Sequence, residues 1–212
     1  MTIYSLVKNM NNFRPAKSQD ANILVSLVSE SSGGVWPAIW KELARNGESI
    51  EAAGARYLVN AANNLSIGNA TVAEFNGDPI GVIICYQEVN VRTGKEKSQD
   101  SATLSNSLTN ALLPYRELRD PDGLFISELC ILPEARGKGI GSQFLKFAAQ
   151  SAMDRGLARL SLRVFSGNSG AVRLYQRSGF EVLDDRSIVP HSGFKYSGSV
   201  LLMTCAVSSV LQ

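Results

Sequence analysis

The stretch LPEARGKGIGSQF, residues 132–144, decides the fold. Three glycines at alternate positions are interleaved with two cations in the order Gly137, Lys138, Gly139, Gly141, with Arg136 in front. An apolar run, Leu124–Pro133, leads into this stretch, and residues 142–156 after it carry apolar side chains at helical spacing. We therefore predict a buried strand, a glycine-rich loop and a helix in that order.

A loop of this kind favours an anion. Unpaired N–H groups gather at a helix N-terminus, and the helix dipole adds partial positive charge there. Alternating glycines let successive N–H groups point into one concavity. We therefore predict a phosphate or pyrophosphate site at the carboxyl end of the strand, built from Arg136, Gly137, Lys138, Gly139, Ile140, Gly141 and Ser142.

Two familiar phosphate loops do not fit this stretch. A Walker A loop needs Ser or Thr after its lysine, but Gly139 follows Lys138. The dinucleotide fingerprint G-x-G-x-x-G fails because the third glycine comes one place early. The pattern R-x-x-G-x-G remains, and on this motif alone a tight turn with surface cations stays open as an alternative.

The rest of the chain completes a mixed α/β pattern. Residues 2–10 alternate weakly, as a strand does, and three segments with helical spacing follow within residues 18–64, the last with Ser49 as N-cap. A hairpin around Asn76-Gly77 comes next, then a polar loop, a short helix, and strand, helix, strand, helix and strand, with Ser166 or Asn168 capping the last helix. A strand–helix–strand unit requires a parallel pair. We expect one domain over residues 1–212, with a mixed sheet and helices on both faces.

Composition narrows the class of protein. The 212 residues carry 21 basic and 19 acidic side chains, a net charge of +2, which is too balanced to predict nucleic-acid or membrane binding. No run approaches the ~18 apolar residues of a membrane span, and we find no signal peptide. Three scattered cysteines, Cys85, Cys130 and Cys205, predict free buried thiols in a reducing cytoplasm, without disulfide or metal site.

A second motif identifies a family. The stretch NSGAVRLYQRSGF, residues 168–180, fits N-x-x-A-x-x-L-Y-x-x-x-G-F. Together with the glycine loop one strand earlier, it resembles the GCN5-related N-acetyltransferase (GNAT) superfamily. The resemblance is strong over Leu124–Val182 and weaker over Phe13–Val89, while residues 90–123 and the tail from Leu183 match nothing assignable.

The resemblance implies how acetyl-CoA would bind. Similar proteins hold it in a wedge between two splayed parallel strands, with the pyrophosphate on the glycine loop. The pantetheine arm would pair with the backbone of Leu129, Cys130, Ile131 and Leu132. Asn168 would contact the cofactor from the end of the next strand, and Ala171 would also bind it.

Acetyl transfer to an amine also needs a proton donor and a way to hold the amine neutral. The resemblance points to Tyr175 as the acid for the leaving thiolate, with packing against the sheet as the alternative. Glu128, an ionisable residue inside an apolar strand, is the candidate base, directly or through water, with a structural salt bridge as the alternative. Its alternating face includes Ile126 and Cys130, and the N–H of Ile131 would support the oxyanion.

Other candidates are weaker. His191 is the single histidine and lies in a polar loop, and Trp36 and Trp40 are core residues or acceptor-pocket residues. We expect the acceptor side to come from residues 33–60, residues 90–123 and the region of His191. Within it, the polar stretch from Thr93 to Ser107 would form a mobile cover.

We therefore predict a cytoplasmic N-acetyltransferase that uses acetyl-CoA as acyl donor. Its partner would be a small-molecule or peptide amine, with no nucleic acid and no membrane, and we allow for a homodimer. Transfer of another acyl group, transfer to a hydroxyl, or a non-catalytic CoA-binding or sensor domain of the same fold are the alternatives.

Overall fold

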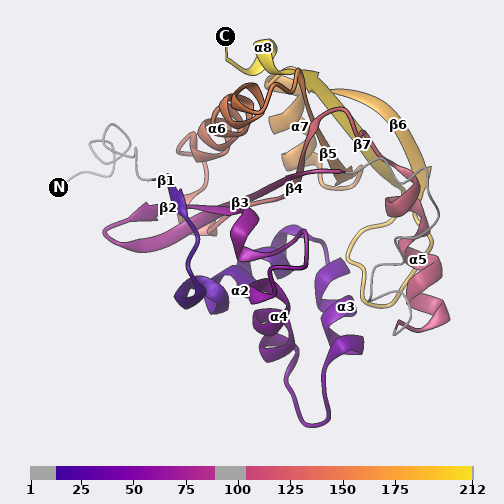
Figure 1. Ribbon diagram of the computed structural model, residues 1–212. Coiled ribbons are helices and arrows are strands. Elements are labelled where there is room, and N and C mark those ends of the chain that lie inside the picture. Colours follow the sequence, from indigo (N-terminus) through magenta and orange to yellow (C-terminus); the bar gives the residue numbers. More distant parts are fainter. Residues whose placement is uncertain (1–12, 89–103, 212) are drawn as a thin grey trace.

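The computed structural model describes residues 13–88 and 104–211 (Figure 1). The strands are β1 (Phe13–Pro15), β2 (Ala70–Phe75), β3 (Asp78–Gln87), β4 (Leu124–Ile131), β5 (Arg159–Phe165), β6 (Glu181–Ser187) and β7 (Ser199–Ala206). The helices are α2 (Ala21–Ser31), α3 (Val35–Leu43), α4 (Ile50–Val59), α5 (Asn106–Glu117), α6 (Ile140–Asp154), α7 (Ser169–Arg177) and α8 (Val207–Val210).

The seven described strands form one mixed sheet in the order β1-β2-β3-β4-β5-β7-β6. Within the described chain, β4 and β5 are the only parallel pair, and the other neighbours are antiparallel. The predicted hairpin is β2–β3, whose turn places Asn76 and Gly77 at positive φ. The predicted mixed sheet and its parallel crossover are confirmed.

The centre of the sheet is splayed. β4 and β5 are paired only from Leu124, opposite Leu160, to Ile126, opposite Leu162, and both strands then continue unpaired with each other. A bulge coincides with the start of this divergence, because Ile84 on β3 lies opposite Glu128 and the next residue lies opposite Ile126. Ser127 is the extra residue of the bulge, which bends β4 and re-aims its side chains.

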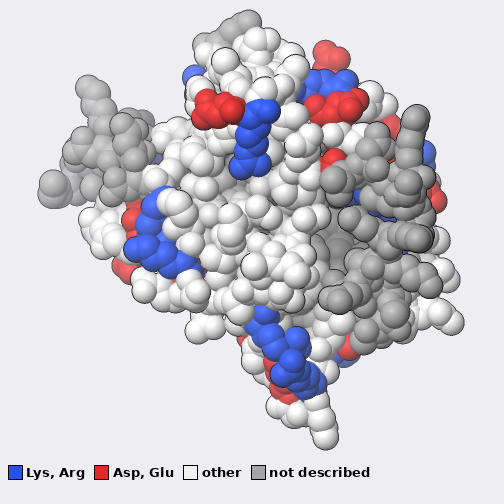
Figure 2. Space-filling model, viewed as in Figure 1, with Lys and Arg blue, Asp and Glu red and all other residues white. Residues whose placement is uncertain are grey.

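Helices cover both faces of the sheet (Figure 1). α2, α3, α4 and α5 share one core with β3 and the far end of β5, where Trp40 is fully buried. α6 and α8 share the second core with β4, β5 and β7, where Phe144 is fully buried. On the face shown in Figure 2, positive and negative side chains of the described residues are intermingled, without a continuous stripe of either sign.

Several local predictions can be scored. Ser49 caps α4 by accepting the N–H of Ala52, and Asn168 rather than Ser166 caps α7 by accepting the N–H of Ala171. The three cysteines are free and buried. The predicted strand over residues 2–10 and most of the predicted mobile cover, residues 93–103, lie outside the described residues.

The sequence analysis missed β1, β6 and α8. β6 is an edge strand whose side chains are mostly exposed, so the sequence EVLDDRS lacks the apolar alternation that signals a strand. It is a strand because its backbone pairs with β7.

Candidate active site

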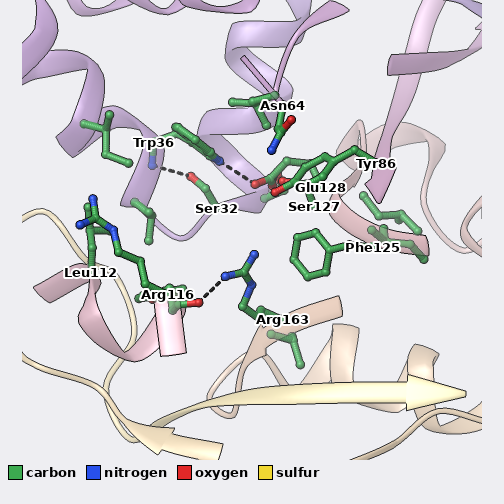
Figure 3. Close-up of a pocket in the computed structure, with 18 of the residues that line it drawn as sticks. Ser32, Trp36, Asn64, Tyr86, Leu112, Arg116, Phe125, Ser127, Glu128 and Arg163 are labelled. Carbon is green, nitrogen blue, oxygen red and sulfur yellow. Dashed lines mark hydrogen bonds between the residues drawn. The ribbon is translucent and has the colours of Figure 1, made fainter. Parts of the chain in front are cut away.

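A cavity of about 690 Å³ opens where β4 and β5 diverge (Figure 3). Its walls come from the ends of β3, β4 and β5 and from α3, α5 and α7. Five of the predicted site residues line it, namely Glu128, Leu129, Asn168, Ala171 and Tyr175. The divergence therefore gathers the candidate acid and the candidate base around one space.

Glu128 is buried, and both of its carboxylate oxygens accept hydrogen bonds. The Ser31 hydroxyl donates to Oε2 at 2.5 Å. The Trp36 indole N–H donates to Oε1 at 2.7 Å (Figure 3). Burial raises the pKa of Glu128 to about 7, while these two bonds and the nearby charge of Arg163 act in the opposite direction. The carboxyl group can therefore gain or lose a proton near neutral pH.

The bulge determines where Glu128 points. Strict alternation predicts that Ile126 shares a face with Glu128 and Cys130, and that prediction is wrong for Ile126. Cys130 packs into the core under α2, α3 and α4, whereas Ile126 packs into the core under α6. The extra residue Ser127 shifts the alternation by one place, so Glu128 reaches α2 and α3.

Tyr175, in the last turn of α7, is buried, and the centroid of its ring lies 5.7 Å from that of Phe180. Burial and the negative charge of Glu128 raise the pKa of Tyr175 above its ordinary value. The phenol therefore stays protonated at neutral pH and is suited to donate a proton. Packing and cavity lining are both features of this residue.

The backbone of β4 offers fewer groups to the divergence than predicted. Leu132 N–H donates to Ile80 O on β3. In an antiparallel ladder, alternate residues bond to the partner, so Cys130 faces β3 in the same way, while the N–H and C=O groups of Leu129 and Ile131 face away from it. Of the four residues predicted to pair with the pantetheine arm, Leu129 and Ile131 are thus the two whose backbone groups face away from β3.

The glycine loop connects β4 to α6 outside the lining of the cavity. Gly137 and Gly139 have φ values of 72° and 80°, in the left-handed region that favours glycine. Gly141 is needed for a different reason, since a Cβ there would lie 3.0 Å from Leu174 Cδ2 on α7. Gly139 is the N-cap residue of α6, and no side chain accepts a hydrogen bond from the first N–H groups of the helix. These N–H groups therefore face outward without a capping partner.

The two loop cations contact neighbouring groups of the protein. Arg136 Nε donates to Ile131 O at 2.9 Å, and its guanidinium forms an ion pair with Glu30. Lys138 Nζ donates to Glu134 O at 2.6 Å. Both contacts are at or near the surface, so the cations remain close to the loop without being buried.

The structure adds residues that the sequence analysis missed. Arg163 lies on β5 just past its last pairing with β4, and it forms an ion pair with Glu88 at 2.9 Å. Ser31, at the end of α2, is the second partner of Glu128. An arginine inside the apolar strand RLSLRVF was a readable signal, since a charged residue there is costly unless it faces a cavity.

The remaining candidates separate clearly. Trp36 lines the cavity, whereas Trp40 is a core residue, and the rings stack at 6.2 Å. His191 does not line the cavity, and its Nδ1 accepts the N–H of Gly193. In the described ranges, no cluster of three or more His, Cys, Asp or Glu side chains could hold a metal ion. None of the helices described is both long and apolar enough to span a bilayer.

Comparison with known proteins identifies the family. The model of the acetyltransferase (GNAT) family matches residues 36–180, which is 145 of the 212 residues. The chain therefore belongs to the GNAT acetyltransferase family, as the two motifs predicted.

Individual relatives match shorter stretches. A bovine thialysine N-epsilon-acetyltransferase is 36% identical over 62 residues, 29% of this chain and 36% of that protein. GCN5-related N-acetyltransferase 6 of Arabidopsis thaliana is 37% identical over 60 residues, 28% of this chain and 21% of that protein. The chain thus spans about a third or less of the length of these two curated relatives. The uncharacterized N-acetyltransferase YycN of Bacillus subtilis is 38% identical, covering 47% of this chain and 81% of that protein.

Solved structures agree on the fold. Arylalkylamine N-acetyltransferase 2 of Aedes aegypti has a TM-score of 0.65 at 14% identity, covering 92% of this chain and 98% of that one. An N-acetyltransferase of Staphylococcus aureus has a TM-score of 0.63 at 17% identity, covering 91% and 99%. At these identities the likeness shows the fold, and the site must be judged from its own residues.

Proposed function

We propose that the protein transfers an acetyl group from acetyl-CoA directly to a primary amine of a small molecule or peptide. One observation carries the proposal. A carboxyl group with a pKa near neutrality, Glu128, and a protonated buried phenol, Tyr175, line the same cavity at the divergence of β4 and β5. A base and an acid around one space are what aminolysis of a thioester requires.

The residues present fit acetyl-CoA, which would supply a thioester at this cavity. The outward backbone groups of Leu129 would pair with its pantetheine arm, while the N–H of Ile131 would be left for the oxyanion and the Ile131 C=O already accepts from Arg136. The uncapped N-terminus of α6, from Gly139 to Ser142, would hold the pyrophosphate, with Arg136 and Lys138 adding charge beside it. The amide of Asn168 keeps its two N–H donors, because capping α7 uses only its oxygen.

Glu128 would accept a proton from the amine. An alkylammonium ion has a pKa near 10.4, so holding the amine neutral at pH 7 costs about 4–5 kcal/mol. A carboxylate that is half deprotonated near pH 7 can take up that proton, directly or through water. The hydrogen bonds from Ser31 and Trp36 fix its orientation, which supports a role at a defined point of the cavity.

Tyr175 would donate a proton to the leaving thiolate, and the N–H of Ile131 would support the oxyanion. The raised pKa keeps the phenol protonated at neutral pH, so it can hydrogen-bond to the developing thiolate, although full proton transfer to this weaker base is uphill. The N–H of Ile131 faces away from β3, which leaves it available for such a bond.

The test is release of free thiol when the protein is mixed with acetyl-CoA and a panel of amines, amino acids, polyamines and peptides. We expect release that depends on one class of amine and an acetylated product of matching mass. Binding of CoA without thiol release for any acceptor would favour a non-catalytic CoA-binding domain. Faster thiol release from another acyl-CoA would mean that the protein transfers a different acyl group. Faster release with an alcohol would mean that the acceptor is a hydroxyl and not an amine.

A further inference from the structure

We infer that the amine acceptor also carries a carboxylate, and that Arg116 and Arg163 bind it. This inference rests on the proposed function and names the substrate class for the same cavity. It begins from the charged side chains of the lining, which are Glu88, Arg116, Arg119, Glu128 and Arg163. Three cations against two carboxyl groups leave the cavity with an excess of positive charge.

Among the described residues, Arg116 and Arg119 are the lining cations without an anionic partner, and Arg116 is the more buried of the two. In the part of the chain that the structure describes, its side chain has neither a hydrogen bond nor an ion pair, and Arg119 Nε bonds only to its backbone oxygen. Its position makes this unusual. Leu108 and Leu112 lie eight and four residues earlier on α5 and are buried, so Arg116 continues the apolar stripe of the helix. A half-buried cation on such a stripe costs free energy unless an anion compensates it.

Arg163 is held in place from three sides. Its Nη2 donates to Glu88 at 2.9 Å, its Nη1 donates to the backbone oxygen of Tyr115, and its guanidinium carbon lies 4.2 Å from the centroid of the Phe125 ring. A guanidinium has five N–H donors, and these bonds use two. Figure 3 shows the group pointing toward the part of the cavity that contains Glu128. Because Glu88 neutralises Arg163, the remaining N–H donors of Arg163 would orient a bound carboxylate. Arg116 would supply the net positive charge.

The other walls suit an apolar body between the two ends of the acceptor. Trp36, Tyr86, Phe125 and Phe165 line the same cavity as Glu128 and Arg116. An amine placed at Glu128 and a carboxylate placed at Arg116 and Arg163 would put each end of the acceptor beside side chains of opposite charge. Polyamines and aminoglycosides, with several positive charges, would meet the excess of arginine and be disfavoured.

The test uses pairs of amines that differ only in a carboxylate, namely 6-aminohexanoate against hexylamine and phenylalanine against 2-phenylethylamine. In the wild type, we expect kcat/KM for the better carboxylated member to exceed that of its partner at least about 10-fold. Arg116→Gln should lower kcat/KM for that carboxylated amine by about 10- to 100-fold and leave the amine without carboxylate within about 2-fold. Arg116→Lys should retain part of the activity, and Arg45→Gln, an exposed arginine outside the cavity, should change neither.

Two outcomes would overturn the inference. Equal kcat/KM for both members of each pair would show that the acceptor needs no carboxylate. An equal loss of kcat/KM for both members in Arg116→Gln would mean that Arg116 only stabilises α5. A second readout separates this inference from the proposed function. The fluorescence of Trp36 should report binding of 6-aminohexanoate without turnover, and this binding should weaken in Arg116→Gln. Carboxylate-dependent binding with no acetylation of any amine would keep the inference and contradict the proposed function.

Discussion

At the scale of single residues, the proposed chemistry depends on one buried carboxyl group. Glu128 lies in a mostly apolar strand, yet both of its oxygens accept hydrogen bonds, from Ser31 and Trp36. Burial without a full ion pair holds its pKa near neutrality, where a general base is most effective. Arg163 is close enough to lower the pKa of Glu128, but its ion pair is with Glu88 and not with Glu128.

The first prediction concerns Glu128→Gln. If Glu128 takes the proton from a bound ammonium ion, wild-type kcat/KM should rise about tenfold per pH unit below pH 7 and level off above it, as the carboxylate form becomes complete. The variant must use the small fraction of neutral amine, so its kcat/KM should be lower and should keep rising toward the amine's own pKa near 10.4. Steady-state kinetics from pH 5.5 to about 9.5 measures both profiles. If kcat/KM of the variant also levels off near pH 7, a group other than Glu128 causes that titration.

The second prediction concerns Tyr175→Phe. Removing the hydroxyl should lower kcat by roughly 10- to 1000-fold and leave acetyl-CoA affinity nearly unchanged, because only the proton donor is lost. Tyr115→Phe is the matched control. That tyrosine also lines the cavity, and its buried hydroxyl has no hydrogen-bond partner in the described structure, so its loss should have little effect. Equal turnover in the two variants would make Tyr175 a packing residue.

At the scale of elements, the site depends on how α3 and α4 support Trp36. Gly54 of α4 lies directly against Trp40 of α3, and a Cβ at Gly54 would lie 2.7 Å from Trp40 Cε3. Trp40 in turn stacks on Trp36, whose indole N–H holds Glu128. Gly54 is therefore the contact point between α3 and α4. A chain of contacts leads from Gly54 through Trp40 and Trp36 to the carboxyl group of Glu128.

The third prediction follows from that contact. Gly54→Ala gains up to about 1 kcal/mol of helix propensity, but forcing a methyl group against a fully buried indole costs about 1–3 kcal/mol. We expect a net loss of stability, measured as a lower urea midpoint. Gly170→Ala on α7 is the control, because its Cβ would enter open space, and it should be neutral or stabilising. A Gly54→Ala protein as stable as the control would show that α3 and α4 can move apart freely.

Sequence patterns predicted the elements better than their pairing details. Helical spacing, the Asn76-Gly77 turn and the glycine loop each act locally, so strands β2, β3, β4, β5 and β7 and helices α2 to α7 could be predicted. The bulge at Ser127 could not, because it is a property of the pairing between β3 and β4. That one residue decides that Glu128 faces Trp36, which simple alternation left ambiguous. β6 was missed because pairing with β7, and not burial, makes it a strand.

At the scale of the whole molecule, the two sides of the cavity differ in what their sequence reveals. The side from β4 to α7 carries compact motifs, since backbone N–H groups and glycines must follow one another closely to bind a phosphate. The proposed acceptor side is assembled from α3, α5 and the ends of β3 and β5, which are far apart in the chain. Its key residues, Glu88, Arg116 and Arg163, come together only through the fold, so no local pattern announced them.

The central claim is that acetyl-CoA binds across the molecule, from the N-terminus of α6 to the divergence of β4 and β5. Two glycines that flank α6 allow a matched test. Gly139 precedes the helix and Gly156 follows it, with φ values of 80° and 71°, and a Cβ at either would meet no atom within 4 Å. Replacing either by valine imposes similar backbone strain, but only the residue at 139 would fill the space in front of the helix N-terminus.

The most direct measurement is therefore calorimetric titration of acetyl-CoA into the wild type, Gly139→Val and Gly156→Val. We predict that the wild type and Gly156→Val bind one acetyl-CoA with the same affinity, and that Gly139→Val binds at least about 10-fold more weakly because its anion site is blocked. A Gly139→Val protein that binds acetyl-CoA as tightly as Gly156→Val, or a wild type that does not bind it, would contradict the account.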